Sequence, residues 1–270
     1  MPYDADRFKA ARRRWSSAIE SMLSAATETM LASVVRSGMD VLDVAAGTGG
    51  QTILAARRVG ASGSVLATDI EAGPLEFAAS AARELGIENV DFRVTPCERL
   101  TEIGATFDAV ISRNGLQYLH DLPKGLAQIY SVVRPGGMLG TVAWSAPEHN
   151  PFLSTSFDIT YRKLGRLPPT RDEPGPFRLG YDKALQSALQ GSGFRSVSVV
   201  TVAALTRFES AAEATQFQHE AGGELLRLMG GLSGAARAEA WVEIAQALRA
   251  FERDSTFVAD GELIVGTGTK

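Results

Sequence analysis

Apolar residues follow two different spacings along the chain, and these spacings alternate. Short runs rich in valine, isoleucine and leucine, typical of buried strands, lie at 41–45, 64–69, 90–94, 107–113, 138–144, 196–202 and 262–267. Between the first five runs, apolar residues recur every three or four positions, as in amphipathic helices, at 52–59, 74–86 and 123–133. Because parallel strands need crossover helices, the pattern predicts an α/β fold with a mostly parallel sheet of seven strands.

Two stretches break this alternation. Residues 145–180 are rich in proline, glycine and aromatic residues and too long for a plain connection, so we expect a short helix and an extended lid there. Residues 209–253 have a helical pattern interrupted at Gly222-Gly223 and Gly230-Gly231, which predicts a helical cap. The segment Arg134-Pro135-Gly136-Gly137 is expected to be a turn that ends one helix and precedes the fifth strand.

Composition and charge narrow the class of protein. The 270 residues are 45% hydrophobic and 21% charged, ordinary values for a globular protein, and the net charge of −4 disfavours nucleic acid as a partner. The single cysteine, Cys97, has no partner for an intrachain disulfide, the N-terminus lacks a signal-peptide pattern, and no run is long enough to span a bilayer. We therefore expect a cytoplasmic protein with a small-molecule substrate and no membrane insertion, and we allow for a homodimer.

The clearest chemical signal is the segment 41–50, VLDVAAGTGG, in which a strand runs into a glycine-rich turn. Gly47 and Gly49 would let a ligand approach backbone N–H groups, although Thr52 stands where a dinucleotide fingerprint has a small residue. Asp69 ends the second strand, where a carboxylate can accept both hydroxyls of an adenosine ribose. Asp43 would repel a pyrophosphate but attract a ligand with ammonium and sulfonium charges, such as S-adenosylmethionine (SAM).

These segments resemble the motifs of the class I SAM-dependent methyltransferases. VLDVAAGTGG is similar to their first motif, the acid of VLATDI to their ribose-binding residue, and FDAVISRNGLQYLHD with LPKGLAQIYSVVRPGGML to their fourth and fifth motifs. The resemblance covers residues 36–144 and, more loosely, the last two strands. Within the class, the chain is most similar to small-molecule methyltransferases related to ubiquinone and menaquinone biosynthesis, including many that act on natural products. The resemblance implies a three-layer, Rossmann-like fold with helices on both faces of the sheet and a helical cap formed by insertions.

The resemblance also implies cofactor-binding residues: Asp43, Ala45, Gly47, Gly49, Asp69, Ile70, Cys97, Asn114 and Trp15. Asp43 and the backbone of the glycine turn would hold the methionine end of SAM, with Asn114 beside it. Asp69 would bind the ribose and Ile70 would pack on the adenine, while Trp15 would cover the cofactor. As a structural alternative, Asp69 would serve only as a helix N-cap.

Adenine recognition departs from the family pattern. Pro96 stands where the family has an acid that accepts from the adenine amino group, so Glu98 or a backbone carbonyl would have to substitute. Cys97 comes next, where the family offers a backbone N–H to the ring. The thiol itself is expected to be a small buried hydrophobe.

The expected organisation follows from these assignments. An N-terminal helical segment at 1–35 would cover the cofactor site, and a SAM-binding core would occupy 36–144. The remaining parts are a lid insertion at 145–180, a core continuation at 181–205, a helical cap insertion at 206–254 and a final core strand within 255–270.

Methyl transfer requires the acceptor atom to be held about 3–3.5 Å from the methyl group, with a base where the acceptor is a hydroxyl or an acidic carbon. His149 and His219 are the candidate bases, while His120 is expected to be structural. The residues expected to line the acceptor pocket are Tyr118, Trp144, Asn150 and Phe152. No metal site is expected, because Ser112-Arg113-Asn114 stands where metal-dependent catechol-type methyltransferases place acids.

We therefore predict transfer of a methyl group from SAM to O, C or N of a small apolar or aromatic metabolite, leaving S-adenosylhomocysteine (SAH). Two alternatives remain open. A nicotinamide-dependent oxidoreductase shares the glycine turn and Asp69, although Asp43 and Thr52 count against it. A SAM-binding cyclase, decarboxylase or non-catalytic module would show the same motifs, because transfer depends on how the acceptor is placed.

Overall fold

The computed structural model describes residues 5–254 and 256–270, with the side chains of residues 5–9 and 12 excepted. The chain divides into two compact units, each made of three segments that alternate along the sequence. The sheet unit comprises Ala25–Ser145, Arg171–Val202 and Leu263–Lys270. The helical unit comprises the described part of Met1–Ser24 together with Ala146–Thr170 and Ala203–Glu262. The stretch 145–180 is thus divided between the units after Thr170.

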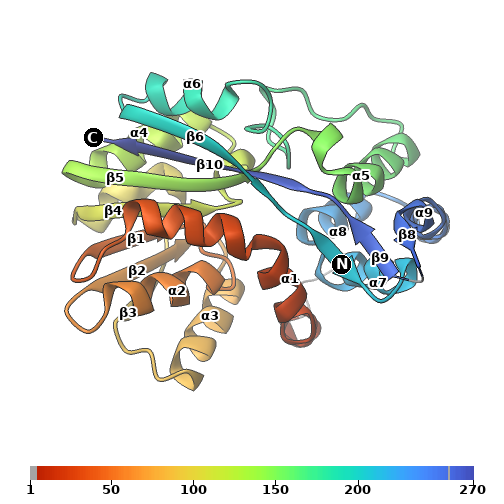
Figure 1. Ribbon diagram of the computed structural model, residues 1–270, viewed down its shortest axis with the longest axis horizontal. Coiled ribbons are helices and arrows are strands. Elements are labelled where there is room, and N and C mark those ends of the chain that lie inside the picture. The colour runs from red at the N-terminus through yellow and green to blue at the C-terminus, as the bar shows by residue number, and fades with distance from the viewer. Residues whose placement is uncertain (1–4, 255) are drawn as a thin grey trace. The chain divides into compact units, whose positions relative to one another are not determined.

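The main sheet has seven strands in the order β3-β2-β1-β4-β5-β10-β6 (Figure 1). Their bounds are β1 Asp40–Val44, β2 Ser64–Asp69, β3 Val90–Val94, β4 Phe107–Arg113, β5 Val133–Trp144, β6 Arg195–Ala203 and β10 Glu262–Thr269. The first five strands pair in parallel and β10 runs antiparallel to β5. The predicted mostly parallel, seven-stranded α/β sheet is confirmed.

Helices cover both faces of this sheet (Figure 1). They are α2 Gly50–Val59, α3 Ala72–Glu84, α4 Leu122–Val132, α6 Ala184–Gly191 and the part of α1 Ala5–Val34 that follows Ser24, with 3₁₀ turns η1 Cys97–Ile103 and η2 Leu116–Tyr118. On one face, apolar side chains of α4 and α6 pack on β4 and β5 in one buried cluster. On the other face, Gly140 of β5 lets α1 approach closely, since a Cβ there would lie 2.8 Å from Val34 and 2.9 Å from Met30. Glycine in this strand therefore serves helix packing.

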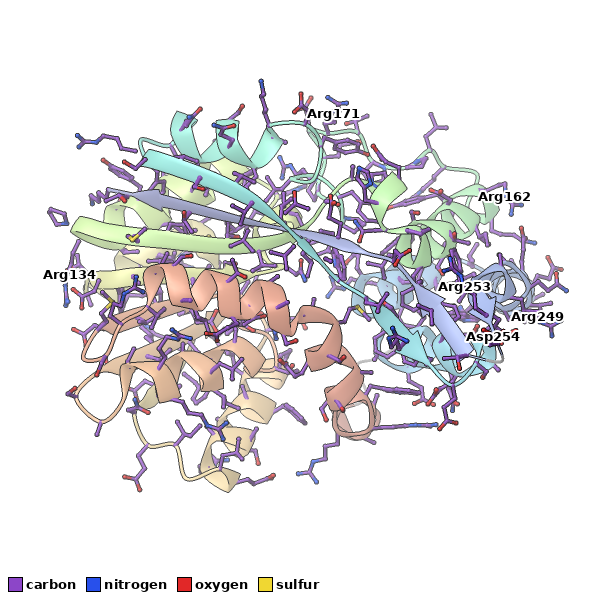
Figure 2. The ribbon with its side chains drawn as sticks, in the orientation of Figure 1. Arg134, Arg162, Arg171, Arg249, Arg253 and Asp254 are labelled. Atoms are coloured by element: carbon purple, nitrogen blue, oxygen red, sulfur yellow. The ribbon has the colours of Figure 1, made fainter. Side chains whose placement is uncertain are left out.

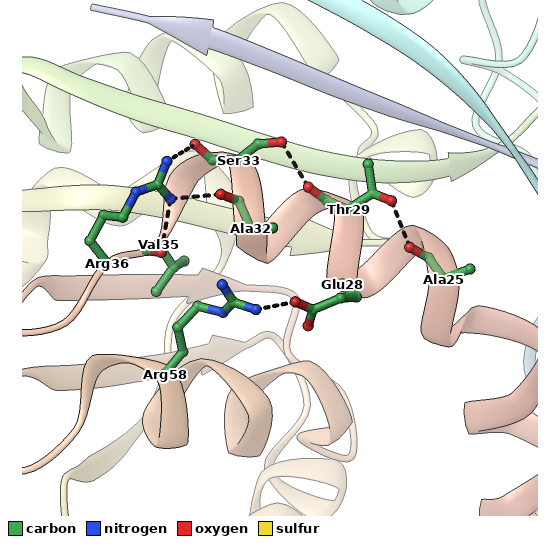
Figure 3. A network of polar contacts seen from close by, with 8 residues as sticks. All are labelled: Ala25, Glu28, Thr29, Ala32, Ser33, Val35, Arg36 and Arg58. Carbon is green, nitrogen blue, oxygen red and sulfur yellow. Dashed lines mark hydrogen bonds and ion pairs between the residues drawn. The ribbon is translucent and has the colours of Figure 1, made fainter.

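The C-terminal end of α1 is closed by a single side chain. The Arg36 guanidinium donates to the carbonyl oxygens of Ala32, Ser33 and Val35 at 2.7, 3.2 and 3.0 Å (Figure 3). These carbonyls are among the four that a helix end leaves without backbone partners. An ion pair between Glu28 and Arg58 joins α1 to α2 nearby (Figure 3).

The segment Arg134-Pro135-Gly136-Gly137 is not the turn that we predicted. It lies within β5, where the register moves from Val133 opposite Phe107 to Met138 opposite Ala109. The irregular stretch is held at the C-terminus of the chain, because Gly136 N–H donates to the Lys270 carbonyl at 3.2 Å. Because the residue that holds this bulge is distant in the sequence, the local sequence shows only the pattern of a turn.

The helical unit contains α5 Pro151–Lys163, α7 Ala211–Ala221, α8 Gly223–Met229 and α9 Gly234–Leu248, with 3₁₀ turns η3 Pro147–His149 and η4 Arg249–Phe251. The predicted breaks in the cap helices at 222–223 and 230–231 are confirmed. The helix α5 is longer than the short helix that we expected. Ion pairs from Arg162 to Glu243 and from Lys163 to Glu239 join α5 to α9, and Figure 2 labels Arg162.

This unit also holds a small antiparallel sheet that the sequence did not predict. It is formed by β7 Thr206–Phe208, β9 Thr256–Ala259 and β8 Glu252–Arg253 in that order. Strands of two to four residues are too short to show a period of two. Among the described helices of both units, none has the length and apolar character needed to cross a membrane.

Candidate functional site

The glycine turn follows β1 at the carboxyl edge of the main sheet and leads into α2. Ala45, Gly47 and Gly49 have left-handed backbones, with φ of 56°, 57° and 78°. A Cβ on Gly47 would meet no atom within 4 Å, whereas one on Gly49 would lie 2.6 Å from the Ala78 Cβ of α3. Gly47 therefore borders open space, while Gly49 is required for the packing of α3 against the turn.

Both backbone polar groups of Gly49 have partners within the protein, and its assignment to the cofactor stays a prediction. Its N–H donates to the Ala46 carbonyl, and its carbonyl accepts from Ile53 N–H, both at 3.0 Å. These bonds close the turn and start α2. The Gly47 N–H is also engaged, because it donates to the Asp69 carboxylate at 2.9 Å.

The side chain of Asp43 has partners within the protein, and its assignment to the cofactor stays a prediction. Its side chain is completely buried. Thr52 Oγ1 donates to one carboxylate oxygen at 2.6 Å, and Gln51 Nε2 donates to the other at 3.1 Å. Burial raises the pKa of this carboxyl to about 7, although both hydrogen bonds and the charge of Arg113 lower it. Asp43 is thus a positioning residue that ties β1 to the first turn of α2, and its charge is weaker at neutral pH than we assumed.

Gln51 and Thr52 are site residues that the sequence did not reveal. Both are buried, and Gln51 Nε2 also donates to the Ala46 carbonyl at 3.3 Å. In the sequence, Thr52 stands out only as a mismatch to a dinucleotide fingerprint. Gln51 and Thr52 lie eight and nine residues from the carboxylate that they bind. This pairing follows from the path of the chain through the turn, and only the folded turn shows it.

Asp69, at the end of β2, holds two peptide groups. One carboxylate oxygen accepts from Gly47 N–H at 2.9 Å and the other from Glu71 N–H at 3.1 Å. The N-cap of α3 is Glu71, so the alternative of Asp69 as N-cap is wrong. Beside it, Ile70 exposes 68% of its surface and Val94, the partner of Asp69 on β3, exposes 54%. The corner thus combines a half-buried carboxylate with exposed apolar side chains.

The expectation that Cys97 is a buried hydrophobe is confirmed. Its thiol is 6% exposed, its Sγ lies 3.7 Å from the Gly125 carbonyl oxygen, and it belongs to the cluster beneath α4. Burial raises the pKa of the thiol to about 12, so no reactive thiolate forms here at neutral pH. Pro96 precedes the 3₁₀ turn η1 as its N-cap.

The turn after β4 lies against the glycine turn. Asn114 has a left-handed backbone with φ 55°, and its N–H donates to the Val142 carbonyl at 2.8 Å. A Cβ on Gly115 would lie 2.5 Å from the Ala45 Cβ, so the two turns are in contact. The buried Gln117 donates to Asn114 Oδ1 at 3.2 Å and orients its carboxamide. Left-handed non-glycine residues on two adjacent strand ends are typical of functional sites.

The four predicted pocket residues belong to different units. Tyr118 and Trp144 are partly buried in the sheet unit, at η2 and at the end of β5. Asn150 is buried in the helical unit, where its amide donates to Ala146 and accepts from Glu262 N–H at 3.1 and 2.9 Å. Phe152 is 3% exposed in the same unit. The last two are packed within the helical unit, and the assignment of all four to an acceptor pocket stays a prediction.

Trp15 also belongs to the core of the helical unit. Its side chain is 4% exposed, its indole N–H donates to Glu220 at 2.7 Å, and its ring packs edge-on against Phe208 and Phe217 at 6.0 and 5.6 Å. Phe152 joins the same cluster through Phe208 and Phe217. A buried indole whose N–H is satisfied packs within its own unit, and its assignment as a cofactor cover stays a prediction.

His120, His149 and His219 are exposed, and the His219 ring contacts Trp241 at 4.8 Å. The assignment of His149 and His219 as bases stays a prediction. Among the described residues, no three acids, cysteines or histidines are grouped as a metal ion would require.

Comparison with known proteins decides between the cofactors that the glycine turn and Asp69 left open. The model of the ubiE/COQ5 methyltransferase family matches residues 19–168, more than half of the chain. The chain belongs to the ubiE/COQ5 methyltransferase family. It is a SAM-dependent methyltransferase, as the resemblance implied, and the nicotinamide alternative is excluded.

Relatives and solved structures agree with this assignment. The methyltransferase is 31% identical over 197 residues to the ubiquinone/menaquinone biosynthesis C-methyltransferase UbiE of Haemophilus ducreyi, with 65% of this chain and 72% of that chain covered. It spans little more than half the length of several further UbiE enzymes that it matches. The YcgJ protein from Bacillus subtilis has a similar fold, with 18% identity, a TM-score of 0.58, and 92% of this chain and 98% of that chain covered.

The [4+2]-cyclase SpnF also shares the fold of this methyltransferase. Its TM-score is 0.53 at 19% identity, with 90% of this chain and 79% of that chain covered. A cyclase on the same framework means that the fold alone does not specify methyl transfer. The family assignment, rather than the fold, therefore carries the activity.

Proposed function

We propose that the protein methylates a ring carbon of a reduced quinone or a similar aromatic small molecule, with SAM bound at the glycine turn of the sheet unit. The single observation that carries the location is the corner at which Asp69 holds the Gly47 N–H beside the exposed Ile70. The acceptor class rests on the UbiE relatives, whose names describe ubiquinone and menaquinone biosynthesis.

The residues of this corner fit SAM chemically. A carboxylate has about four lone-pair sites, so Asp69 can accept ribose hydroxyls while it holds Gly47 and Glu71 N–H. Ile70 offers an exposed apolar surface to the adenine, and Gly47 leaves room for close approach. Ala45 and Asn114 border the same corner, which supports placing the methionine end beside them.

SAM supplies the methyl group on a sulfonium sulfur. The chain contributes placement, since an acceptor carbon must be held in line with the bond that breaks. Tyr118 and Trp144 are the proposed contacts for the acceptor ring, from the ends of β4 and β5. Proton removal from a ring hydroxyl makes the ring carbon more nucleophilic, and His149 and His219 are the proposed bases.

The test is methyl transfer to a 1,4-naphthoquinol that carries one alkyl chain and is kept reduced with dithionite. We expect a mass gain of one methyl group, on carbon by NMR, and at least tenfold weaker SAM binding in Asp69→Ala. The matched control is Asp91→Ala, an exposed acid of β3, which should bind SAM as the parent protein does.

Three outcomes would contradict parts of this proposal. Methyl transfer to oxygen or nitrogen would overturn the acceptor atom. SAM binding that survives Asp69→Ala would overturn the location. SAM binding without transfer to any quinol or phenol tested would favour a cyclase, a decarboxylase or a binding module.

A homodimer and a cytoplasmic location remain predictions from the sequence, which sedimentation and cell fractionation would test.

A further inference from the structure

Asp43 stands apart from the other acids of the protein. Among the described residues, Asp43 is the one acid whose side chain is fully buried. It lies on β1, directly before the glycine turn. Both of its oxygens have partners, Thr52 and Gln51, which are themselves buried. A charge placed there is screened little by water, so it acts strongly on any charge at the turn.

The partners of Asp43 accommodate a proton without rearrangement. A threonine hydroxyl can donate to an ionised carboxylate and can equally accept from a protonated one. Gln51 Nε2 donates to the other oxygen, which remains an acceptor in both states. The short Thr52 contact of 2.6 Å therefore persists whether or not the carboxyl is charged. Protonation changes the charge beside the turn while it leaves the turn closed.

Charged groups of both signs act on Asp43. Arg113 on β4 favours the ionised carboxyl, Asp69 on β2 opposes it, and α2 contributes only the neutral Gln51 and Thr52. Burial is the largest influence and raises the pKa of the carboxyl to about 7. A cation bound at the turn would therefore change its protonation near neutral pH.

We propose that Asp43 distinguishes SAM from SAH by its charge: it is ionised with the sulfonium of SAM bound and protonated when the neutral thioether occupies the turn. This inference rests on the proposed location of SAM. On SAM binding the proton passes from Asp43 to the buffer, and it is taken up again from solvent with the product bound. Asp43 is thus a specificity residue that acts through its charge and touches neither ligand.

The size of the effect follows from linkage. If the sulfonium lowers the pKa of Asp43 by about one unit, SAM binding at pH 7 releases about 0.4 proton more than SAH binding. The SAM-to-SAH affinity ratio then rises about fivefold from pH 6 to pH 8. The α-amino group is common to both ligands, so its own titration cancels in this ratio.

The experiment is isothermal titration of the full chain with SAM and with SAH, in buffers of different ionisation enthalpy at pH 7. The excess proton release with SAM should disappear in Asp43→Asn, an isostere that Thr52 and Gln51 can still hold. Thr52→Val removes a hydrogen bond that lowers the pKa of Asp43, so the pH midpoint of the SAM-to-SAH ratio should move upwards. Thr52→Ser keeps the hydroxyl and should leave that midpoint unchanged.

Each result separates the two proposals. If neither SAM nor SAH binding responds to Asp69→Ala, the proposed location fails. If both ligands bind there but release the same number of protons, or if Asp43→Asn keeps the difference, the inference about Asp43 is overturned. A difference that disappears only in Asp43→Asn and shifts in Thr52→Val supports it.

Discussion

The carboxyl group of Asp43 helps to close the glycine turn, although its burial is unfavourable for folding. The carboxyl loses its hydration on folding, which disfavours its ionised form. The hydrogen bonds from Thr52 and Gln51 offset part of this cost and close the first turn of α2 against β1. The residue is best explained by its role at the turn, because a neutral isostere would be more stable in the same place.

This explanation predicts a pH-dependent gain in stability for Asp43→Asn. The folded pKa of about 7 lies above the ordinary aspartate value of 3.8, so between these pH values the folded chain binds a proton that the unfolded chain does not. The contribution of Asp43 is therefore fully present below about pH 4 and lost as the pH rises through about 7. At pH 8 the variant should be more stable by about 2–4 kcal/mol, and the difference should narrow by pH 5.

Urea unfolding at pH 5 and pH 8 measures this difference. Asp91→Asn, at an exposed position of β3, serves as the control and should behave alike at both pH values. An Asp43→Asn gain that is equal at pH 5 and pH 8 would show that the folded carboxyl is already ionised at pH 5.

Gly115 tests the contact between the two turns. Its backbone, with φ −104°, suits any residue, so an added methyl group acts by volume alone. It would lie 2.5 Å from the Ala45 Cβ and 3.0 Å from Ser112 Oγ. We expect Gly115→Ala to cost about 1–3 kcal/mol of stability and to weaken SAM binding, because Ala45 must move.

Thermal unfolding and SAM titration check this prediction. Gly191→Ala is the matched control, since a Cβ at the end of α6 meets no atom within 4 Å. It should leave SAM binding unchanged and stability equal or slightly higher. Unchanged SAM binding in Gly115→Ala would show that the turn after β4 is not part of the cofactor site.

Among the elements, β5 joins the amino ends of two other strands. Arg134, which lies in its bulge and is labelled in Figure 2, donates to Asp40 of β1 at 2.9 Å and pairs with Asp108 of β4 at 2.7 Å. Asp108 also accepts from Asp40 N–H at 2.9 Å. This network lies at the edge of the sheet opposite the glycine turn, so it supports the bulge and not the site.

Arg134→Met should therefore lower stability without affecting the cofactor. Arg134 is 38% exposed, so solvent screening limits the expected loss to about 1 kcal/mol, less at high salt. Arg99→Met removes a more exposed pair with Glu102 within η1 and should produce no measurable change. Denaturant unfolding at low and high salt tests both variants, and altered SAM affinity in Arg134→Met would contradict a purely structural role.

At the scale of the whole molecule, the proposed cofactor site lies within one of the two units. Asp43, Gly47 and Asp69 all belong to the sheet unit, and so do Asn114 and Gln117. The buried residues Trp15, Asn150 and Phe152 all belong to the helical unit. Cofactor binding should thus depend on the sheet unit, while variants of the aromatic cluster should act on stability.

A thermal shift assay measures cofactor binding on the intact chain. SAM at about 100 times its Kd should stabilise the protein by about 2.7 kcal/mol, which raises Tm by roughly 5–10 °C for a chain of this size. NADH should produce no shift, and Asp69→Ala should lose most of the shift with SAM. A shift with NADH comparable to that with SAM would contradict the discrimination expected at this site.

What the sequence alone determined was local. The alternation of strand and helix spacings, the glycine turn and the acid at the end of β2 are patterns within a few residues, so they predicted the seven-stranded sheet and the place of Asp69 at a strand end. The tertiary structure decided which groups meet. It assigned Thr52 and Gln51 to Asp43, Trp15 to Phe217, and the bulge of β5 to Lys270. These pairings arise from burial and hydrogen bonding between folded elements, and a spacing along the chain does not encode them.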